Sequence, residues 1–297
     1  MIEYYINSKH GKINILDGKF INKNNIKGII LHIHGLGSHF QFIYNSLDEF
    51  ECRDTFFNSY GYKSFAFEFN GHGKSEGKKC YITNFNDLID NLYDVIIHIK
   101  SIYPNHHLYI CSESMGCGIV CKYIMTNLDC KLIKGVILLS PLCSIDEHLI
   151  PDKFIIETLI IVSRYLPWIQ LKLTNNKVSD TTSNLEYINA KKNCKYNFND
   201  IHYLCTVREL FLFSLWINNN NNLINQIKIP FIIFHGLRDQ ITTPQGSINL
   251  FNQLKTNKKS LVLLPKSNHC LLVPLSPDDL TPYYIYYKIL KWLQIQH

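Results

Sequence analysis

Residues 108–125 read LYICSESMGCGIVCKYIM, and this stretch decides the fold that we predict for the chain. The apolar run Leu108–Cys111 is typical of a buried parallel strand. A sharp turn follows it, and then apolar residues recur at helical spacing, at Ile119, Val120, Tyr123 and Ile124. A serine between a strand and a helix lies on a tight turn, with its hydroxyl above the sheet and the positive end of the helix dipole beneath it. Ser114 is therefore a candidate nucleophile.

Short apolar segments alternate with amphipathic segments along most of the chain. Further buried strands are predicted at 28–34, 64–69, 135–139, 230–235 and 260–264, and helices at 50–59, 83–103, 244–254 and 283–293. A hairpin with strands at 4–6 and 13–16 precedes them. This alternation specifies an α/β fold, with a mostly parallel central sheet flanked by helices on both faces.

The alternation breaks once, between Pro141 and Ile229. Helices are predicted there at 151–165, 185–190 and 207–218, and the asparagine run 218–222 is predicted to be a loop. An insertion of this size between two core strands predicts a helical cap over the carboxyl ends of the strands, where ligands bind in open α/β sheets. We therefore expect a core formed by 1–142 and 227–297, with residues 143–226 inserted as the cap.

The first cap helix contains the apolar sequence FIIETLIIVSRYLPWI at 154–169. It is too short to span a membrane and carries Glu157 and Arg164. Two interpretations stay open. The helix either packs on the core, or forms an apolar mouth that admits lipid substrates or touches a membrane surface.

Composition excludes several classes of function. The chain has 297 residues, a hydrophobic fraction of 46% and a net charge of +6, with lysines scattered rather than clustered, so we expect a globular core and no nucleic-acid partner. The N-terminal residues lack the features of a signal peptide, so a cytoplasmic protein with ten reduced cysteines is expected. Cys117 and Cys121 have no second pair, and we expect no metal site there or at the pair His32 and His34.

A serine nucleophile needs a base, a group that orients the base, and donors for the oxyanion. Asp239 follows the predicted strand at 230–235, and His269 follows the one at 260–264. The chain order is therefore Ser114, Asp239, His269, which is the order found in α/β-hydrolases. We expect His269 to take the proton of Ser114, and Asp239 to orient His269.

Two backbone N–H groups are the candidate oxyanion donors. One belongs to Met115, at the start of the helix, and the other to Leu36, in the loop after the strand at 28–34. Glycines on both sides of Leu36 let this loop approach a substrate closely. His34, Gly35 and Glu113 are the candidate substrate contacts.

With these motifs together, the chain resembles the monoglyceride lipase and lysophospholipase group of serine α/β-hydrolases over nearly its whole length. The matching segments are HGLGSH at 34–39, GHGKSEG at 71–77, the turn at Ser114, SPL at 140–142, HGLRD at 235–239 and NH at 268–269. The resemblance implies hydrolysis of carboxylic esters, typically monoacylglycerols or lysophospholipids, with a cap that governs entry. It also implies that neither a metal nor an organic cofactor is needed.

Two residues depart from the pattern of this group. Ser112 stands where glycine is usual, two residues before the nucleophile, and we expect it to be tolerated with some strain. Glu68 stands where aspartate is usual before the GHGKSEG loop. His72, within that loop, is expected to be structural, because the chemistry assigned to the triad does not require it.

Several alternatives remain at this point. The same site serves a carboxylesterase or thioesterase of small hydrophobic esters. A peptidase is disfavoured, because no acidic cluster for a substrate amine is evident in the cap. A non-catalytic hydrolase-fold protein that binds a lipid or a partner is disfavoured, because all three triad residues are present. Peripheral membrane contact through the cap is an open expectation, and the sequence indicates no oligomeric state.

Overall fold

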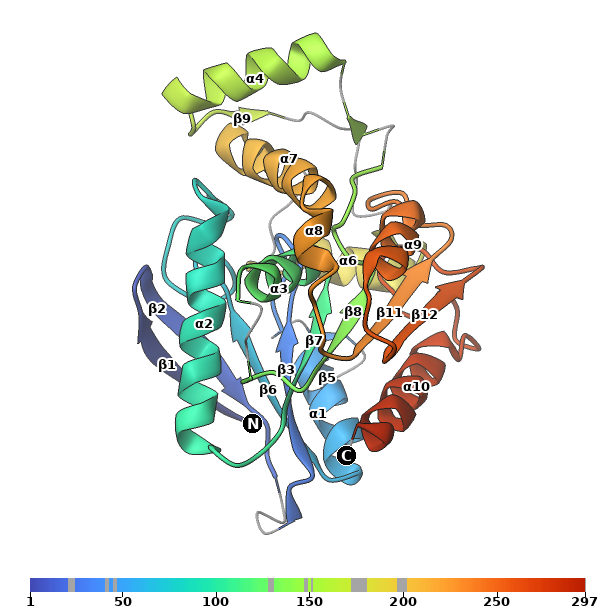
Figure 1. Ribbon diagram of the computed structural model, residues 1–297. Helices are drawn as coiled ribbons and strands as arrows, with labels where there is room; N and C mark the ends of the chain where they lie inside the picture. Colours follow the sequence, from blue (N-terminus) through green and yellow to red (C-terminus); the bar gives the residue numbers. More distant parts are fainter. Residues whose placement is uncertain are drawn as a thin grey trace.

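The computed structural model describes residues 1–20, 25–40, 43–44, 47–127, 131–146, 149–150, 152–171, 181–196 and 202–296. Its centre is an eight-stranded sheet (Figure 1). In spatial order the strands are β1 (Ile2–Ser8), β2 (Gly11–Asp17), β6 (Tyr62–Glu68), β3 (Gly28–Ile33), β7 (Leu108–Glu113), β8 (Gly135–Leu139), β11 (Phe231–Gly236) and β12 (Lys259–Leu264). From β6 to β12 the strands are parallel, whereas β1 and β2 pair antiparallel to their neighbours. The predicted α/β class with a mostly parallel sheet is confirmed.

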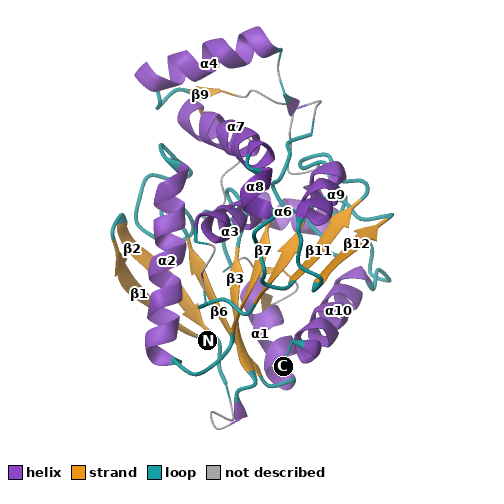
Figure 2. Cartoon of the chain, in the orientation of Figure 1, coloured by secondary structure: helices purple, strands orange, loops and turns teal. Residues whose placement is uncertain are grey.

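Alternate side chains of the strands enter two separate cores. In β3, Ile29, Leu31 and Ile33 pack on the face covered by α2 (Phe85–Ile102), α3 (Met115–Thr126) and α9 (Pro244–Gln253). Ile30 points to the other face, where α1 (Glu49–Ser59) and α10 (Thr281–Ile295) lie. The strands thus lie at the centre with helices around them, as Figure 2 shows. Burial on both faces explains why these strands read as continuous apolar runs in the sequence.

Helix α2 illustrates how the sequence positions its elements. Asn84 caps the N-terminus of the helix, and its side chain accepts a hydrogen bond from the N–H of Asn86. Its buried side chains recur three and four residues apart, at Phe85, Leu88, Asn91, Leu92, Val95, Ile96 and Ile99. The helix ends at Ile102, ahead of Pro104, because proline disfavours helical backbone in the residue before it.

The segment 143–226, which we call the cap segment, contains helices and very short strands. They are α4 (Lys153–Tyr165), β9 (Gln170–Leu171), α6 (Leu185–Asn193), β10 (His202–Tyr203), α7 (Leu204–Asn219) and α8 (Asn221–Ile224). Figure 1 shows α4, β9 and α7 above the sheet, beyond the carboxyl ends of the parallel strands. The three predicted cap helices are confirmed, except that Pro151 lies outside the described residues. The pair β9 and β10 was not expected from the sequence. The antiparallel pair β4 (Ile43–Tyr44) and β5 (Leu47–Asp48), which falls within the segment 1–142, was not expected either.

The asparagine run at 218–222 is not the loop that its composition predicts. Helix α7 continues to Asn219 and α8 starts at Asn221. The side chain of Asn218 donates to the carbonyl oxygens of Ser214 (2.7 Å) and Cys143 (3.0 Å). Because these amides satisfy carbonyl groups near the end of α7, asparagine is compatible with helix here.

Helix α7 fixes the cap segment to the core. The buried hydroxyl of Thr206 donates to the carbonyl oxygen of Cys80 (2.7 Å) and accepts from the N–H of Ile82 (3.0 Å). The carboxylate of Glu209 accepts from the N–H of Phe85, the first residue of α2, at 2.8 Å. These contacts place α7 over the same edge of the sheet on which α3 begins.

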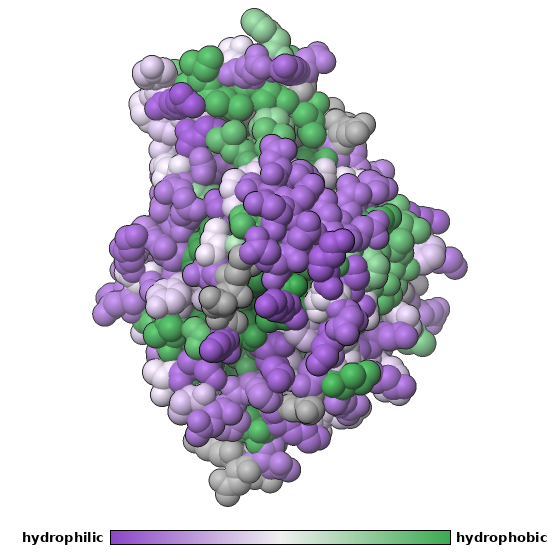
Figure 3. Space-filling model, viewed as in Figure 1, coloured by the Kyte–Doolittle hydropathy of each residue, from purple (hydrophilic) through white to green (hydrophobic). Residues whose placement is uncertain are grey.

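Helix α4 lies outside α7 and exposes much of its apolar surface. Phe154, Ile161 and Tyr165 are 79%, 58% and 76% exposed. Of the residues of α4, all of which the structure describes, only Ser163 is buried. The interpretation of this helix as one packed on the core is therefore wrong, because it packs against α7. Figure 3 shows apolar surface gathered in this upper part of the molecule. Over the described ranges, every helix falls short of the length and apolarity needed to cross a membrane.

Candidate active site

Ser114 lies on the turn between β7 and α3. Its backbone has φ +49° and ψ −118°, a left-handed conformation that non-glycine residues rarely adopt. The carbonyl oxygen of Ser114 accepts hydrogen bonds from the N–H groups of Cys117 (3.1 Å) and Leu142 (3.0 Å), which hold the turn. Gly116 is required beside it, because a Cβ there would lie 2.6 Å from the carbonyl oxygen of His34. The turn therefore presents the hydroxyl at the carboxyl end of β7, where the sequence predicts it.

Ser112, which replaces the usual glycine, is fully buried in this turn. Its hydroxyl donates to the carbonyl oxygen of Ile137 on β8, at 3.4 Å. Its carbonyl oxygen accepts from the thiol of Cys117 at 3.0 Å. Serine is accommodated here because the neighbouring strand supplies an acceptor for its hydroxyl.

Glu68, the second departure, braces the loop at 71–77. Its carboxylate accepts hydrogen bonds from the N–H of Lys74 (2.7 Å) and the side chain of Asn14 (3.0 Å). A Cβ on Gly73 would lie 2.1 Å from this carboxyl group, so glycine lets the loop fold over it. Burial raises the pKa of Glu68, and these hydrogen bonds offset only part of that effect.

The structure brings the three predicted triad residues together. His269 Nε2 lies 3.0 Å from Ser114 Oγ, and His269 Nδ1 lies 2.7 Å from Asp239 Oδ2. Asp239 follows β11 and His269 follows β12, and the two loops pack closely, since a Cβ on Gly236 would lie 2.3 Å from the carbonyl oxygen of Ser267. The hydrogen-bond direction that fits is Nδ1–H donating to Asp239, with Nε2 accepting the hydroxyl proton of Ser114.

Asp239 is held as a carboxylate. Its Oδ1 accepts from the N–H groups of Ile241 (2.8 Å) and Thr242 (3.1 Å), and its Oδ2 accepts from the Thr242 hydroxyl (3.1 Å). Burial alone would raise the pKa of Asp239. The positive charge that His269 can carry and the hydrogen bonds from His235 and His269 outweigh it and hold the pKa well below its usual range.

His235 supports Asp239 from behind, a role that the sequence reasoning missed. His235 Nε2 lies 3.2 Å from Asp239 Oδ2 and 3.0 Å from the carbonyl oxygen of Thr242. His235 Nδ1 lies 2.6 Å from the hydroxyl of Ser247, which donates to it. The available signal was a histidine four residues before the aspartate in HGLRD.

The two candidate oxyanion donors lie beside Ser114. Leu36 borders both cavities that contain the Ser114 side chain, and Met115 borders the first of them. Within the described residues, neither of their N–H groups donates a hydrogen bond to the protein. A Cβ on Gly35 would lie 3.0 Å from Ser114 Cβ, so glycine brings this loop against the nucleophile.

His34 is placed differently from the expected substrate contact. It is buried and borders neither of the two cavities at Ser114. His34 Nδ1 lies 2.7 Å from the carbonyl oxygen of Gly35, and its Nε2 accepts from the N–H of Phe69 at 3.2 Å. Both ring nitrogens are therefore engaged with the backbone, and the side chain holds the loop shape instead of facing a ligand. Gly35 does border a cavity.

Glu113 borders a cavity and also has an ion partner inside the protein. Its carboxylate pairs with the guanidinium of Arg53, a fully buried residue of α1. The guanidinium lies 5.2 Å from the centre of the Phe40 ring. Sequence reasoning had no signal for Arg53, because this residue belongs to none of the motifs that follow the carboxyl ends of the strands.

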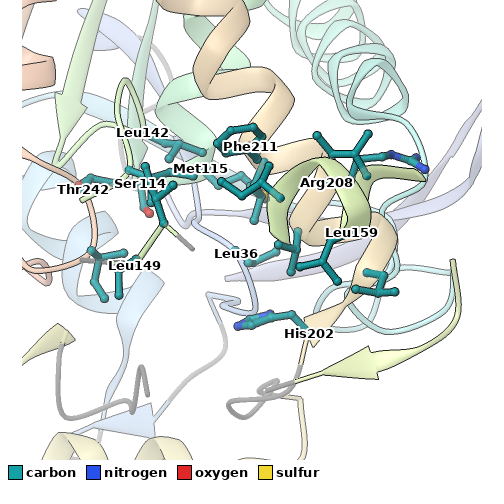
Figure 4. A pocket seen from close by; sticks show the side chains of 18 residues that line it. Leu36, Ser114, Met115, Leu142, Leu149, Leu159, His202, Arg208, Phe211 and Thr242 are labelled. Atoms are coloured by element: carbon teal, nitrogen blue, oxygen red, sulfur yellow. The ribbon is translucent and has the colours of Figure 1, made fainter. Parts of the chain in front are cut away.

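Two cavities meet at Ser114. The first, about 220 Å³, lies under the cap segment and is almost entirely apolar, with Arg208 and His202 among its few polar side chains. Figure 4 shows Ser114 and Arg208 on opposite sides of it, with Leu159 of α4 and Phe211 of α7 among the residues that line it. The second cavity, about 190 Å³, contains His269 and is lined by more polar groups, including Thr181, Tyr187 and Lys191. Across the described ranges, we find no cluster of histidine, cysteine and acidic residues that could hold a metal ion.

Comparison with known proteins places this geometry in a family. Residues 24–274 match the family model for serine aminopeptidases of the S33 type. Caffeoylshikimate esterase of Arabidopsis thaliana is 24% identical over 86% of this chain and 74% of its own. Monoglyceride lipase of Saccharomyces cerevisiae is 25% identical over 84% of this chain and 79% of its own.

Solved structures show the same fold. The monoacylglycerol lipase of Paleococcus ferrophilus superposes with a TM-score of 0.78 at 19% identity, over the whole of both chains. A soluble variant of the Saccharomyces cerevisiae monoglyceride lipase, in complex with a substrate analogue, gives 0.81 at 22% identity over 99% of this chain and 94% of the other. The chain therefore belongs to the serine aminopeptidase S33 family of α/β-hydrolases, in the group that contains the monoglyceride lipases.

Proposed function

We propose that the protein hydrolyses esters of apolar acyl chains with small polar alcohols, and that monoacylglycerols or lysophospholipids are its substrates. One observation carries the proposal: Ser114, His269 and Asp239, whose side chains are joined by hydrogen bonds, lie where an apolar cavity meets a polar one. The relatives named above, two lipases of monoglycerides and an esterase, support ester hydrolysis.

The reaction follows from the distances at Ser114. The Oγ attacks the ester carbonyl carbon as its proton passes to His269 Nε2, 3.0 Å away. The N–H groups of Leu36 and Met115 stabilise the oxyanion. The acyl carbon–oxygen bond then breaks, His269 gives its proton to the leaving alcohol, and an acyl-enzyme remains. Water, deprotonated by His269, then attacks the acyl carbon. The bond between the acyl carbon and Ser114 Oγ breaks, His269 returns the proton to Ser114, and the acid leaves.

Asp239 keeps His269 in the reactive tautomer. Its Oδ2 accepts the Nδ1 proton, which leaves Nε2 free to accept a proton from Ser114. The carboxylate also stabilises the imidazolium that forms during each step. The low pKa of Asp239 keeps this negative charge in place throughout the physiological pH range.

The apolar cavity is the proposed site of the acyl chain. Ile156, Leu159 and Ile160 of α4 contribute to its wall, so residues 143–226 act in this proposal as a cap that controls entry of the chain. The exposed apolar side of the same helix, with Phe154, Ile161 and Tyr165, suits contact with a lipid surface. Co-sedimentation with phosphatidylcholine vesicles tests this contact. A Phe154→Ser/Ile161→Ser variant that sediments as the wild type does would contradict it.

Labelling with a fluorophosphonate probe tests the nucleophile. The Ser114→Ala variant is expected to lose labelling, and kcat is expected to fall by a factor on the order of 10⁴ to 10⁶. Ser101→Ala, at an exposed position of α2, is the matched control and should behave as the wild type. Turnover that persists in Ser114→Ala would end the proposal.

A series of acylglycerols of increasing chain length separates the lipase from a general carboxylesterase. We expect kcat/KM to rise with chain length, because each methylene buried in the apolar cavity contributes about 0.8 kcal/mol. Activity restricted to short, water-soluble esters would favour the carboxylesterase.

A further inference from the structure

The segment 140–146, which we call the β8 loop, follows β8 and contributes no triad residue, yet it contacts the backbone of two of them. The N–H of Leu142 donates to the carbonyl oxygen of Ser114 at 3.0 Å. The hydroxyl of Ser140 donates to the carbonyl oxygen of His269 at 2.8 Å. The β8 loop therefore joins the turn of the nucleophile to the loop of the base.

The β8 loop also pairs with the loop that contains Asp239. The N–H of Thr243 donates to the carbonyl oxygen of Ser144 at 3.1 Å. The N–H of Asp146 donates to the carbonyl oxygen of Ile241 at 3.2 Å. The N–H of Ile241 in turn donates to Asp239 Oδ1 at 2.8 Å. The loops of all three triad residues thus meet at the β8 loop, and a residue within it can set the distances between them.

Ser140 has a backbone conformation that serine rarely adopts. Its φ is +46°, in the left-handed region, and within the described residues this region contains two other non-glycine residues, Cys80 and Ser114. Glycine adopts such a φ without a steric penalty, so a serine there is strained. Strain of this kind persists where the surrounding structure imposes it, and it is concentrated at functional sites. What serine offers at this position and glycine does not is a hydroxyl, and that hydroxyl binds His269.

The hydroxyl of Ser140 is placed to fix the backbone of the base. Over the described residues, no other hydrogen bond reaches the backbone N–H or carbonyl oxygen of His269. The imidazole lies 3.0 Å from Ser114 Oγ and 2.7 Å from Asp239 Oδ2, within reach for proton transfer. Because a shift of the His269 backbone moves the ring with it, loss of the Ser140 hydroxyl changes both distances. A misplacement of about 1 Å in such a site costs about a hundredfold in rate.

We propose that Ser140 is a positioning residue for the reaction: its hydroxyl fixes the backbone of His269 and so holds Nε2 where it takes the proton of Ser114. This inference rests on the function proposed above and adds one residue to its machinery. It also explains why a strained serine stands where glycine would fit the backbone better. A purely structural role for Ser140 would instead make stability and activity change together.

Three substitutions separate the hydroxyl of Ser140 from its strained backbone. Ser140→Gly removes the hydroxyl and relieves the strain, Ser140→Ala removes the hydroxyl and keeps the strain, and Ser140→Thr keeps both. For 1-decanoylglycerol, we expect kcat of the glycine and alanine variants to fall about tenfold to hundredfold, with KM within about threefold of the wild type. The melting temperature of Ser140→Gly should lie about 2–4 °C above that of Ser140→Ala, because alanine keeps the steric penalty. Ser140→Thr should unfold more easily than the wild type, because a β-branched residue is poorly tolerated at this φ, yet its kcat should stay within about threefold.

Ser64→Ala is the matched control, because Ser64 is a fully buried serine of β6 that borders neither cavity at Ser114. It should keep wild-type kcat. The inference is overturned if folded Ser140→Gly and Ser140→Ala keep kcat within about threefold of the wild type, or if kcat of the three Ser140 variants follows their melting temperatures. Either result with an active wild type ends this inference alone. A wild type that hydrolyses neither 1-decanoylglycerol nor 4-nitrophenyl decanoate ends the proposed function, and this inference with it.

Discussion

Replacing Asp239 by asparagine tests whether the hydrogen bonds around this side chain set the tautomer of His269. The variant keeps the shape of the side chain. Two backbone N–H groups, of Ile241 and Thr242, point at Oδ1 at 2.8 and 3.1 Å. This position must remain an oxygen, because an amide N–H₂ there would face two other donors.

The amide N–H₂ of the asparagine therefore occupies the Oδ2 position, 2.7 Å from His269 Nδ1. Nδ1 can then only accept, and the ring proton moves to Nε2, where it points at Ser114 Oγ. In that tautomer His269 cannot take the proton of the nucleophile. We expect kcat to fall by a factor on the order of 10⁴, which is about 5.5 kcal/mol of transition-state stabilisation.

The assay is steady-state hydrolysis of 1-decanoylglycerol, together with thermal unfolding to show that the fold is intact. Asp278→Asn, at an exposed position of the loop that precedes α10, serves as the control and should keep wild-type kcat. A loss smaller than tenfold in a well-folded Asp239→Asn protein would refute the tautomer argument, and with it the orienting role of Asp239.

Three further predictions concern stability. Burial lowers the pKa of His72 and of His39 to about 4, so both rings stay neutral in the folded protein. The free energy of unfolding is therefore largest above the unfolded pKa near 6.5. It decreases as pH falls toward 4, because the unfolded chain then binds protons that the folded protein does not. Urea unfolding at pH 7 and pH 4.5 should differ by up to about 3 kcal/mol per histidine, and equal stabilities would contradict the burial of neutral rings. Gly116→Ala should unfold about 1–3 kcal/mol more easily and lose activity, because its Cβ would meet the His34 carbonyl oxygen at 2.6 Å; an unchanged melting temperature would disprove this close approach. Thr206→Val leaves the Cys80 carbonyl and the Ile82 N–H unpaired and should cost about 1–3 kcal/mol in thermal unfolding, and a neutral effect would show that α7 is anchored elsewhere.

The sequence predicted the core elements because their signals are local. A strand buried on both faces reads as an apolar run, and an amphipathic helix such as α2 repeats its apolar residues every three or four positions. The same locality explains the error in the asparagine run, where composition favours a loop. The amide of Asn218 stabilises helix there through an acceptor on Cys143, which no local pattern reveals.

The candidate triad was also readable from the sequence, because parallel strands bring their carboxyl ends to one edge of the sheet. Residues that follow β7, β11 and β12 must therefore lie near one another, and Ser114, Asp239 and His269 do. The supporting groups were not readable. His235 was predicted only as the end of a strand, and His34 as a substrate contact, because their roles depend on which polar atoms the packed loops bring into reach.

The sequence by itself determined the α/β architecture and the serine, aspartate and histidine of the candidate site, since both follow from periodicity and from the order of motifs along the chain. Only the tertiary structure decided that Ser114 lies between an apolar and a polar cavity, that Arg53 pairs with Glu113, and that His235 contacts Asp239. Most of these contacts join residues distant in the chain. Their geometry depends on how α1 and the cap segment pack around the edge of the sheet, and sequence spacing does not encode that packing.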